Sequence, residues 1–123
     1  MPRQILGDST GKPYSPGTRS GKLVFVSGQL GLDAQGKVVS GGIAAETRQV
    51  LENVKSVLAL AGASLDHVTM VNIYLIDLDG DFTPMNQVYR EFFTASPPAR
   101  ATVEVRKLAL GTKVEISAIA VLD

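Results

Sequence analysis

The sequence predicts a single α+β domain in which two helices cover one face of a β-sheet. Segments 41–64 and 79–96 repeat apolar residues at spacings of three and four, which is typical of amphipathic helices. Segments rich in β-branched residues stand before, between and after these helices, so we expect the element order β-β-α-β-α-β-β. The chain has 123 residues, a length that suits one domain, and no linker, repeat or low-complexity segment divides residues 1–123.

The first half of the chain is expected to contribute two strands and the longer helix. Residues 11–21 are rich in Gly, Pro and Ser, which predicts a loop. LVFVSGQL at 23–30 predicts a strand, and a short second strand is expected at 38–40. The helix at 41–64 has Gly62 as its expected C-cap. Its predicted buried stripe comprises Ile43, Thr47, Val50, Leu51, Val54, Val57, Leu58 and Ala61.

The second half is expected to contain the strongest strand, at 67–78. Both faces of this strand are largely apolar, so we expect both to be covered, with another subunit as one candidate cover. Asp81 is the expected cap of the second helix, and Pro84 should fall early in it, where a missing N–H costs little. Strands at 99–105 and 113–122 close the chain. The predicted buried stripe of the second helix comprises Phe82, Met85, Val88, Tyr89, Phe92 and Phe93.

The composition argues against several classes of function. Lys plus Arg and Asp plus Glu number 12 each, and this zero net charge does not favour a general nucleic-acid binder. The absence of cysteine excludes disulfides, thiolate metal sites and cysteine nucleophiles, and a single histidine leaves no set of ligands for a zinc site. From this lack of ligands we expect no metal ion. No apolar segment is long enough to be a signal peptide or to span a membrane, so we expect a cytoplasmic protein.

Two charged residues on the last two strands are candidates for chemistry. Arg100 follows the rigid Pro97–Pro98 pair, and it is either an ordinary solvated charge or a planar cation that binds a carboxylate. Glu115 shares one strand face with apolar residues. It is either an ion-pair partner of Arg106 or Lys113, or a carboxylate in a pocket whose pKa is raised so that it can exchange protons with a water.

Two further candidates are Tyr14 and Asn86. Tyr14 stands in the loop KPYSPG, where it either covers a pocket or packs the loop against the domain. Asn86 lies at the boundary of the second helix's apolar stripe and is either a pocket residue or a surface amide. The glycine-rich stretch at 27–33 lacks the spacing of a phosphate-binding loop, and no pair of His or Asp residues has the spacing of metal ligands.

Stretches along almost the whole chain together resemble the RidA/YjgF family. The clearest are PPARATVEV at 97–105 and VEISAIAV at 114–121, with further matches at 13–16, 23–33, 43–66, 81–82 and 85–93. The resemblance implies a chorismate-mutase-like α+β domain with a mixed sheet and two helices on one face. It also implies that three copies assemble into a homotrimer around a central barrel, with clefts between neighbouring subunits.

The same resemblance implies an activity that needs no metal or organic cofactor. Family members hydrolyse reactive enamines and imines, such as 2-aminoacrylate and 2-iminopropanoate, to 2-keto acids and ammonia. By position, Arg100 would hold the substrate carboxylate and Glu115 would orient or activate the attacking water. The residues that would line the cleft are Tyr14 in its covering loop, Gly28 in the SGQ turn, Asn86, and Thr102 where many members have cysteine.

The sequence departs from the family pattern at Lys12 in the loop and at Ser117, where a second glutamate is common. Both departures concern substrate preference. Two other functions stay open. The same cleft could bind small carboxylates without turnover, as a regulatory protein does, or the protein could be an endoribonuclease or translation inhibitor, an activity also attributed to the family.

Overall fold

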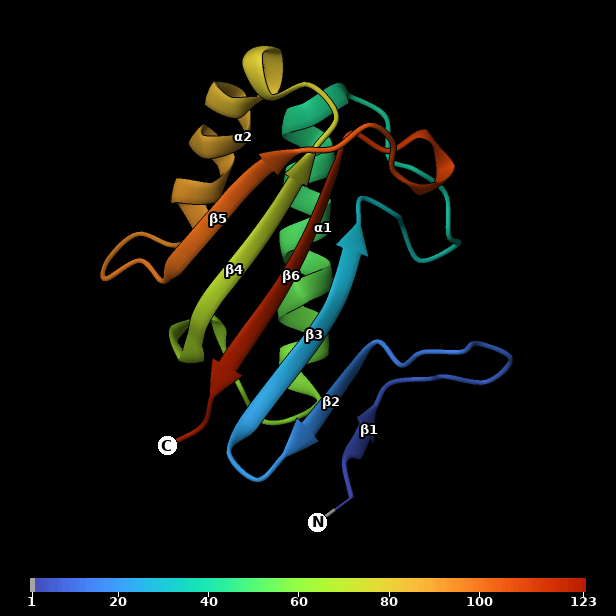
Figure 1. Cartoon of the computed structure of the whole chain (residues 1–123), viewed down its shortest axis with the longest axis vertical. Coiled ribbons are helices and arrows are strands. Elements are labelled where there is room, and N and C mark those ends of the chain that lie inside the picture. Colours follow the sequence, from blue (N-terminus) through green and yellow to red (C-terminus); the bar gives the residue numbers. More distant parts are fainter. Residues whose placement is uncertain (1) are drawn as a thin grey trace.

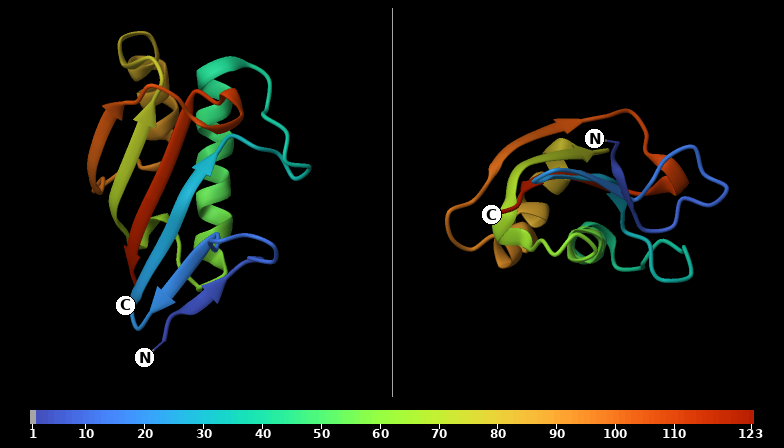
Figure 2. Two further views of the ribbon diagram at one scale, coloured as in Figure 1. Left: turned by 45° about the vertical axis from the view of Figure 1, so that its right-hand side comes forward. Right: turned by 90° about the horizontal axis from the view of Figure 1, so that it is seen from below.

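The computed structural model describes residues 2–123, which form one six-stranded sheet with two helices on one side of it (Figures 1 and 2). The sheet order is β1-β2-β3-β6-β4-β5, and it is mixed because β4 and β5 run parallel while every other pair is antiparallel. The elements are β1 (Gln4–Leu6), β2 (Gly17–Ser20), β3 (Leu23–Leu30), α1 (Gly42–Ala59), β4 (Val68–Leu75), α2 (Leu78–Phe92), β5 (Ala99–Glu104) and β6 (Val114–Val121).

The hydrophobic core lies between the helices and one face of the sheet. Alternate residues of the three central strands point into it, so that along β6 the buried positions are 114, 116, 118 and 120. The stripe predicted for α1 supplies the opposite wall. The largest fully buried side chains are Leu51, Leu58, Ile73, Leu75, Met85 and Ile116. The predicted layer of two helices on one face of the sheet is confirmed.

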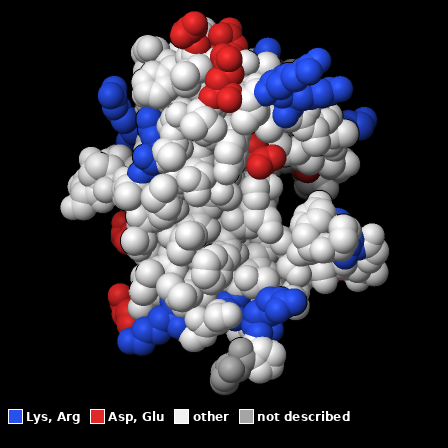
Figure 3. All heavy atoms as spheres, viewed as in Figure 1, with Lys and Arg blue, Asp and Glu red and all other residues white. Residues whose placement is uncertain are grey.

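The other face of the sheet has no cover in a single chain. Leu23 and Phe25 of β3 and Val121 of β6 are 42%, 38% and 40% exposed, although they belong to the central strands. Figure 3 views this face and shows that its middle is largely uncharged, while Lys, Arg, Asp and Glu gather toward the two ends. An uncharged face with exposed aliphatic and aromatic side chains is typical of an interaction surface.

The start of α2 differs from the prediction. The helix begins at Leu78, and its N-cap is Asp77, whose Oδ1 accepts the Gly80 N–H at 3.0 Å, rather than Asp81. Because the helix starts earlier than expected, Pro84 lies inside it and leaves the Gly80 carbonyl without an amide donor at that position. Phe82, expected in the buried stripe, is 37% exposed.

The first strands also differ from the prediction. Residues 38–40 form only an isolated bridge, Leu32 to Val38, and not a strand. Instead, β2 arises from the end of the segment expected to be a loop, where Gly17–Ser20 pair with β3, and β1 pairs with β2. Pairing with neighbouring strands stabilises these two short segments of three and four residues, which are too short for a strand pattern to show in the sequence. Neither helix in residues 2–123 combines the length and the apolarity that crossing a membrane requires.

Candidate active site

Arg100 lies on β5, an edge strand, and its side chain points to the helix side of the sheet. Its register partner on β4 is the buried Val71. Arg100 Nη1 donates a hydrogen bond to Asn86 Oδ1 at 2.7 Å, and its guanidinium carbon lies 4.8 Å from the ring centroid of Tyr89. The ring centroid of Phe82 lies 5.7 Å from the same guanidinium carbon. These contacts hold the guanidinium between α2 and β5.

Arg100 forms no salt bridge within residues 2–123. A guanidinium carries five N–H donors, and within these residues a hydrogen bond to Asn86 uses one of them. The fixed position and the remaining donors suit a planar anion such as a carboxylate, which accepts two parallel hydrogen bonds from Arg. The geometry therefore favours a binding group over a solvated charge.

Tyr89 and Thr102 carry buried hydroxyls on the same side of the sheet as Arg100. The Tyr89 hydroxyl and Thr102 Oγ1 are buried and have no hydrogen-bond partner among residues 2–123. Burial raises the pKa of Tyr89, and the nearby Arg100 opposes that shift. Thr102 stands two residues after Arg100 on the same strand face, opposite Ile73 of β4. We call Arg100, Asn86, Tyr89 and Thr102 the arginine group.

Glu115 lies on β6, at the centre of the sheet, and its side chain points to the open face. It is paired with Tyr74 of β4 and Leu30 of β3. Burial raises its pKa above the ordinary 4.5. Within residues 2–123 it forms no salt bridge, so the ion pair with Arg106 or Lys113 that the sequence left open is not formed. Glu115 is thus a half-buried carboxylate whose protonated form is favoured by burial.

Gly28 is positioned directly against Glu115. The ladder between β3 and β6 is irregular between Val26 and Gln29, which brings the Gly28 backbone over the glutamate. A Cβ atom on Gly28 would lie 2.7 Å from Glu115 Cδ and closer still to its Oε2. Glycine is therefore required here for close approach rather than for an unusual backbone angle.

Tyr14 lies in the loop before β2 and lines one cavity together with Gly28. Its loop is tied to β3, because Ser27 Oγ donates to the Ser15 carbonyl at 2.6 Å. Tyr14 is 58% exposed, and with Gly28 and Lys12 it lines an open cavity of about 490 Å³. The loop therefore presents Tyr14 to solvent instead of packing it against the domain. We call Tyr14, Gly28 and Glu115 the glutamate group.

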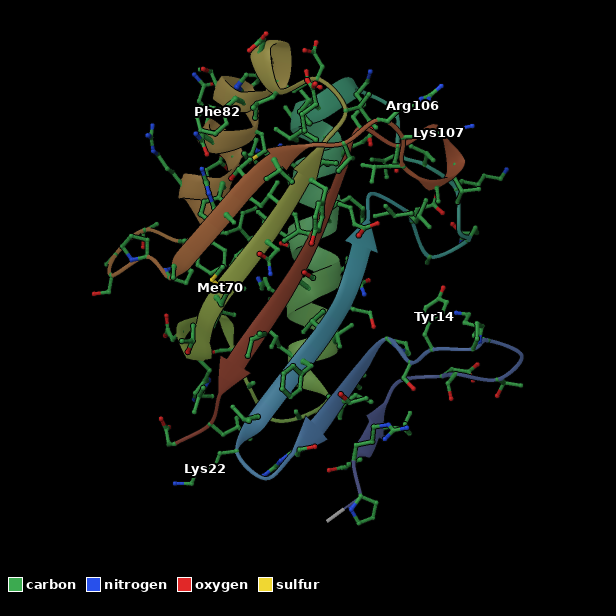
Figure 4. The ribbon with its side chains drawn as sticks, in the orientation of Figure 1. Tyr14, Lys22, Met70, Phe82, Arg106 and Lys107 are labelled. Carbon is green, nitrogen blue, oxygen red and sulfur yellow. The ribbon has the colours of Figure 1, made fainter. Side chains whose placement is uncertain are left out.

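The two groups do not meet within one chain. The arginine group faces the helices at the β5 edge, whereas Glu115 faces outward from the opposite surface of the sheet. Figure 4 shows Phe82, beside the arginine group, and Tyr14 on opposite sides of the molecule. Arg100 contacts Asn86, Gly28 lies against Glu115, and Tyr14 lines a cavity together with Gly28. A substrate that contacts both Arg100 and Glu115 would need two copies of the chain.

Sequence reasoning missed the aromatic support of Arg100. Tyr89 was assigned only to the buried stripe of the second helix, and Phe82 likewise. The helical spacing of 82, 86 and 89 places all three side chains on one face of α2, and this signal could have identified them as neighbours of one group. No cluster of His, Asp and Glu in residues 2–123 is suited to hold a metal ion.

The fold and sequence match known proteins along almost the whole chain. The family model described as "Endoribonuclease L-PSP" matches residues 8–122. "Protein DfrA" of Myxococcus xanthus is 49% identical over 89% of this chain and 85% of its own. A Bos taurus "2-iminobutanoate/2-iminopropanoate deaminase" is 42% identical over 89% and 80%. The solved E. coli YjgF gene product superposes with a TM-score of 0.89 at 34% identity, over 96% of this chain and 98% of that one.

Proposed function

The chain belongs to the endoribonuclease L-PSP family, which includes the RidA/YjgF proteins, and on this premise we propose that it hydrolyses 2-imino acids to 2-keto acids and ammonia. The observation that carries the proposal is the guanidinium of Arg100, which Asn86 and Tyr89 hold in place and which forms no salt bridge within residues 2–123. The name of the Bos taurus relative supports the same reaction. The proposal extends to the tautomeric enamines, with 2-aminoacrylate as the simplest.

Arg100 would bind the carboxylate that every 2-imino acid carries. A bidentate pair fixes both the position and the plane of this carboxylate, and so it fixes the adjacent imine carbon. Holding that carbon beside a water converts a collision of two molecules into a step within one complex. Asn86 and the Tyr89 ring hold the guanidinium in place before the substrate arrives.

Glu115 would move the protons. Water adds to the carbon of the protonated imine, and Glu115 accepts the proton that this water loses. Glu115 returns this proton to the nitrogen of the tetrahedral amino alcohol, the C–N bond breaks to release ammonia, and Glu115 takes up the hydroxyl proton as the carbonyl forms. The product is a 2-keto acid. Burial raises the pKa of Glu115, which suits a group that must both accept and donate a proton. This route needs no nucleophilic cysteine, and the sequence contains no cysteine.

We infer that the site is completed by a second copy of the chain in a homotrimer. The support is geometric: each chain carries Arg100 and Glu115 on opposite faces of its sheet, and one of those faces is apolar and open. In a cyclic assembly, the arginine group of one copy meets the glutamate group of the next, and every copy contributes to two equivalent clefts. Light scattering after gel filtration would give three times the mass of the chain.

The activity is tested in a coupled assay. An amino-acid oxidase generates imines from a panel of amino acids, and semicarbazide traps the imine that remains. Wild type should divert imine to keto acid, whereas Arg100→Ala, as an assembly of the same size, should not. An Arg100→Ala variant with full activity would refute the assigned role of Arg100.

Binding of small carboxylates without turnover is the second candidate function. The arginine group is complete within one chain, whereas the proton-transferring glutamate is not beside it. Saturable binding of pyruvate without hydrolysis of any imine would favour this function. No observation favours RNA cleavage: the net charge is zero, and His67 Nδ1 accepts the Ser64 N–H at 3.0 Å, as part of a short helical turn.

A further inference from the structure

A second arginine lines the cavity beside Arg100. This cavity, of about 380 Å³, lies between α2 and the start of β5, and both Arg90 and Arg100 line it. The rings of Tyr89 and Phe93 form part of its wall and pack together, with their centroids 4.7 Å apart. The cavity therefore presents two cationic side chains beside an apolar wall.

The positions of the two cations follow from α2. Asn86, which accepts the hydrogen bond of Arg100, and Arg90 are four residues apart on this helix. Side chains at this spacing share a helix face and have Cβ atoms about 5–6 Å apart. Arg90 therefore lies one turn beyond the group that anchors Arg100, on the side of the cavity nearer the C-terminal end of α2.

The cavity has no negative charge to offset the two arginines. None of its lining residues is acidic, and within residues 2–123 neither Arg90 nor Arg100 forms a salt bridge. The nearest acid in sequence, Glu91, is engaged on another face of α2, where it binds Arg48 at 3.0 Å. Two unpaired guanidinium groups around one cavity attract a ligand with two anionic groups.

We propose that this cavity selects substrates with a second carboxylate, namely the 2-imino acids derived from four- and five-carbon dicarboxylic amino acids. The inference rests on the proposed function, because Arg100 takes the carboxylate next to the imine. Arg90 takes the distal carboxylate, and the short carbon chain between the two lies against Tyr89 and Phe93.

The test compares ligands of equal chain length with and without the distal carboxylate. Calorimetry measures the dissociation constants of glutarate and pentanoate, and the coupled assay measures kcat/KM for the imines of glutamate and norvaline. Wild type should favour the diacid in both measurements. Arg90→Gln should lower this preference about tenfold, the size of a lost charge-assisted hydrogen bond. Arg3→Gln is the matched control, because it also removes one exposed positive charge, next to the sheet edge opposite β5.

The outcomes separate this inference from the proposed function. Equal binding of glutarate and pentanoate by wild type, or an unchanged preference in Arg90→Gln, overturns the inference even if norvaline imine is hydrolysed. If no imine is hydrolysed but glutarate binding depends on Arg90, the proposed function fails and the diacid site stands. An equal loss of preference in Arg3→Gln would show that total charge, and not the cavity, attracts the diacid.

Discussion

Replacing Gly28 with alanine should displace the proton-transferring carboxyl while leaving the fold intact. The added Cβ would lie 2.7 Å from Glu115 Cδ. Carbon atoms in contact stay about 3.5–4.0 Å apart, so the carboxyl group must move by about 1 Å. A misplacement of about 1 Å in a catalytic group costs on the order of a hundredfold in rate. We therefore expect Gly28→Ala to lower kcat/KM for imine hydrolysis about a hundredfold.

The stability of this variant should change little. The colliding atoms are the end of a flexible side chain, and alanine restricts the unfolded chain, so the free energy of unfolding should change by about 1 kcal/mol or less. For a domain of this size, that corresponds to a shift in Tm of about 4 °C. Thermal denaturation followed by circular dichroism, at one protein concentration, measures this shift.

A double-mutant cycle with Glu115→Ala identifies the cause of the loss. This truncation removes the atoms with which the new Cβ collides, so Gly28→Ala should cost at most about twofold more in the Glu115→Ala background. The coupled imine assay gives kcat/KM for the four proteins. A hundredfold loss in both backgrounds, or no loss in either, would refute the view that Gly28 acts by making room for Glu115.

Three further predictions concern the anchor of the cation, the titration of the carboxyl and the start of α2. Asn86→Ala removes the 2.7 Å acceptor of Arg100, and it should weaken pyruvate binding about tenfold in calorimetry; unchanged binding would show that Asn86 does not position the guanidinium. The pKa of Glu115 is raised by burial, so the folded state binds its proton more tightly than the unfolded state. The free energy of unfolding of wild type, relative to that of Glu115→Gln, should therefore decline as pH rises from 4.5 through the raised pKa. Urea denaturation of both proteins across this pH range measures the difference, and a difference that grew with pH would contradict the prediction. Asp77→Ala removes the acceptor of the Gly80 N–H and should lower the free energy of unfolding by about 1 kcal/mol, whereas Asp77→Asn should keep most of it.

The sequence predicted the elements that carry their own pattern. The strand at 23–30 was placed with its observed bounds, and the amphipathic helices and the late strands were placed to within a few residues, because apolar periodicity reports burial directly. The short strands β1 and β2 were missed, because pairing of β1 with β2 and of β2 with β3 stabilises them and three or four residues carry too little pattern. The cap of α2 was misplaced, since Asp77 and Asp81 are both acceptable caps by residue type.

The candidate residues were found through motifs, but their arrangement was not. The chain pairs Arg100 with Asn86 and brings Gly28 against Glu115, contacts that only the fold reveals. Alternation along a strand predicts which residues share a face, yet it does not tell which face of β5 matches which face of β6. That relation depends on strand order and register, and it places Arg100 and Glu115 on opposite surfaces of the sheet.

The most direct test of the shared site mixes two inactive variants. Arg100→Ala and Glu115→Gln chains, carrying different tags, are unfolded together in equal amounts and refolded, and native mass spectrometry verifies that the assemblies are mixed. If each cleft takes Arg100 from one copy and Glu115 from its neighbour, random mixing leaves about a quarter of the clefts intact in a cyclic assembly. The mixture should then recover about a quarter of wild-type imine hydrolysis. A mixture no more active than the separate variants would contradict the account, because Arg100 and Glu115 would not then act on one substrate across two copies.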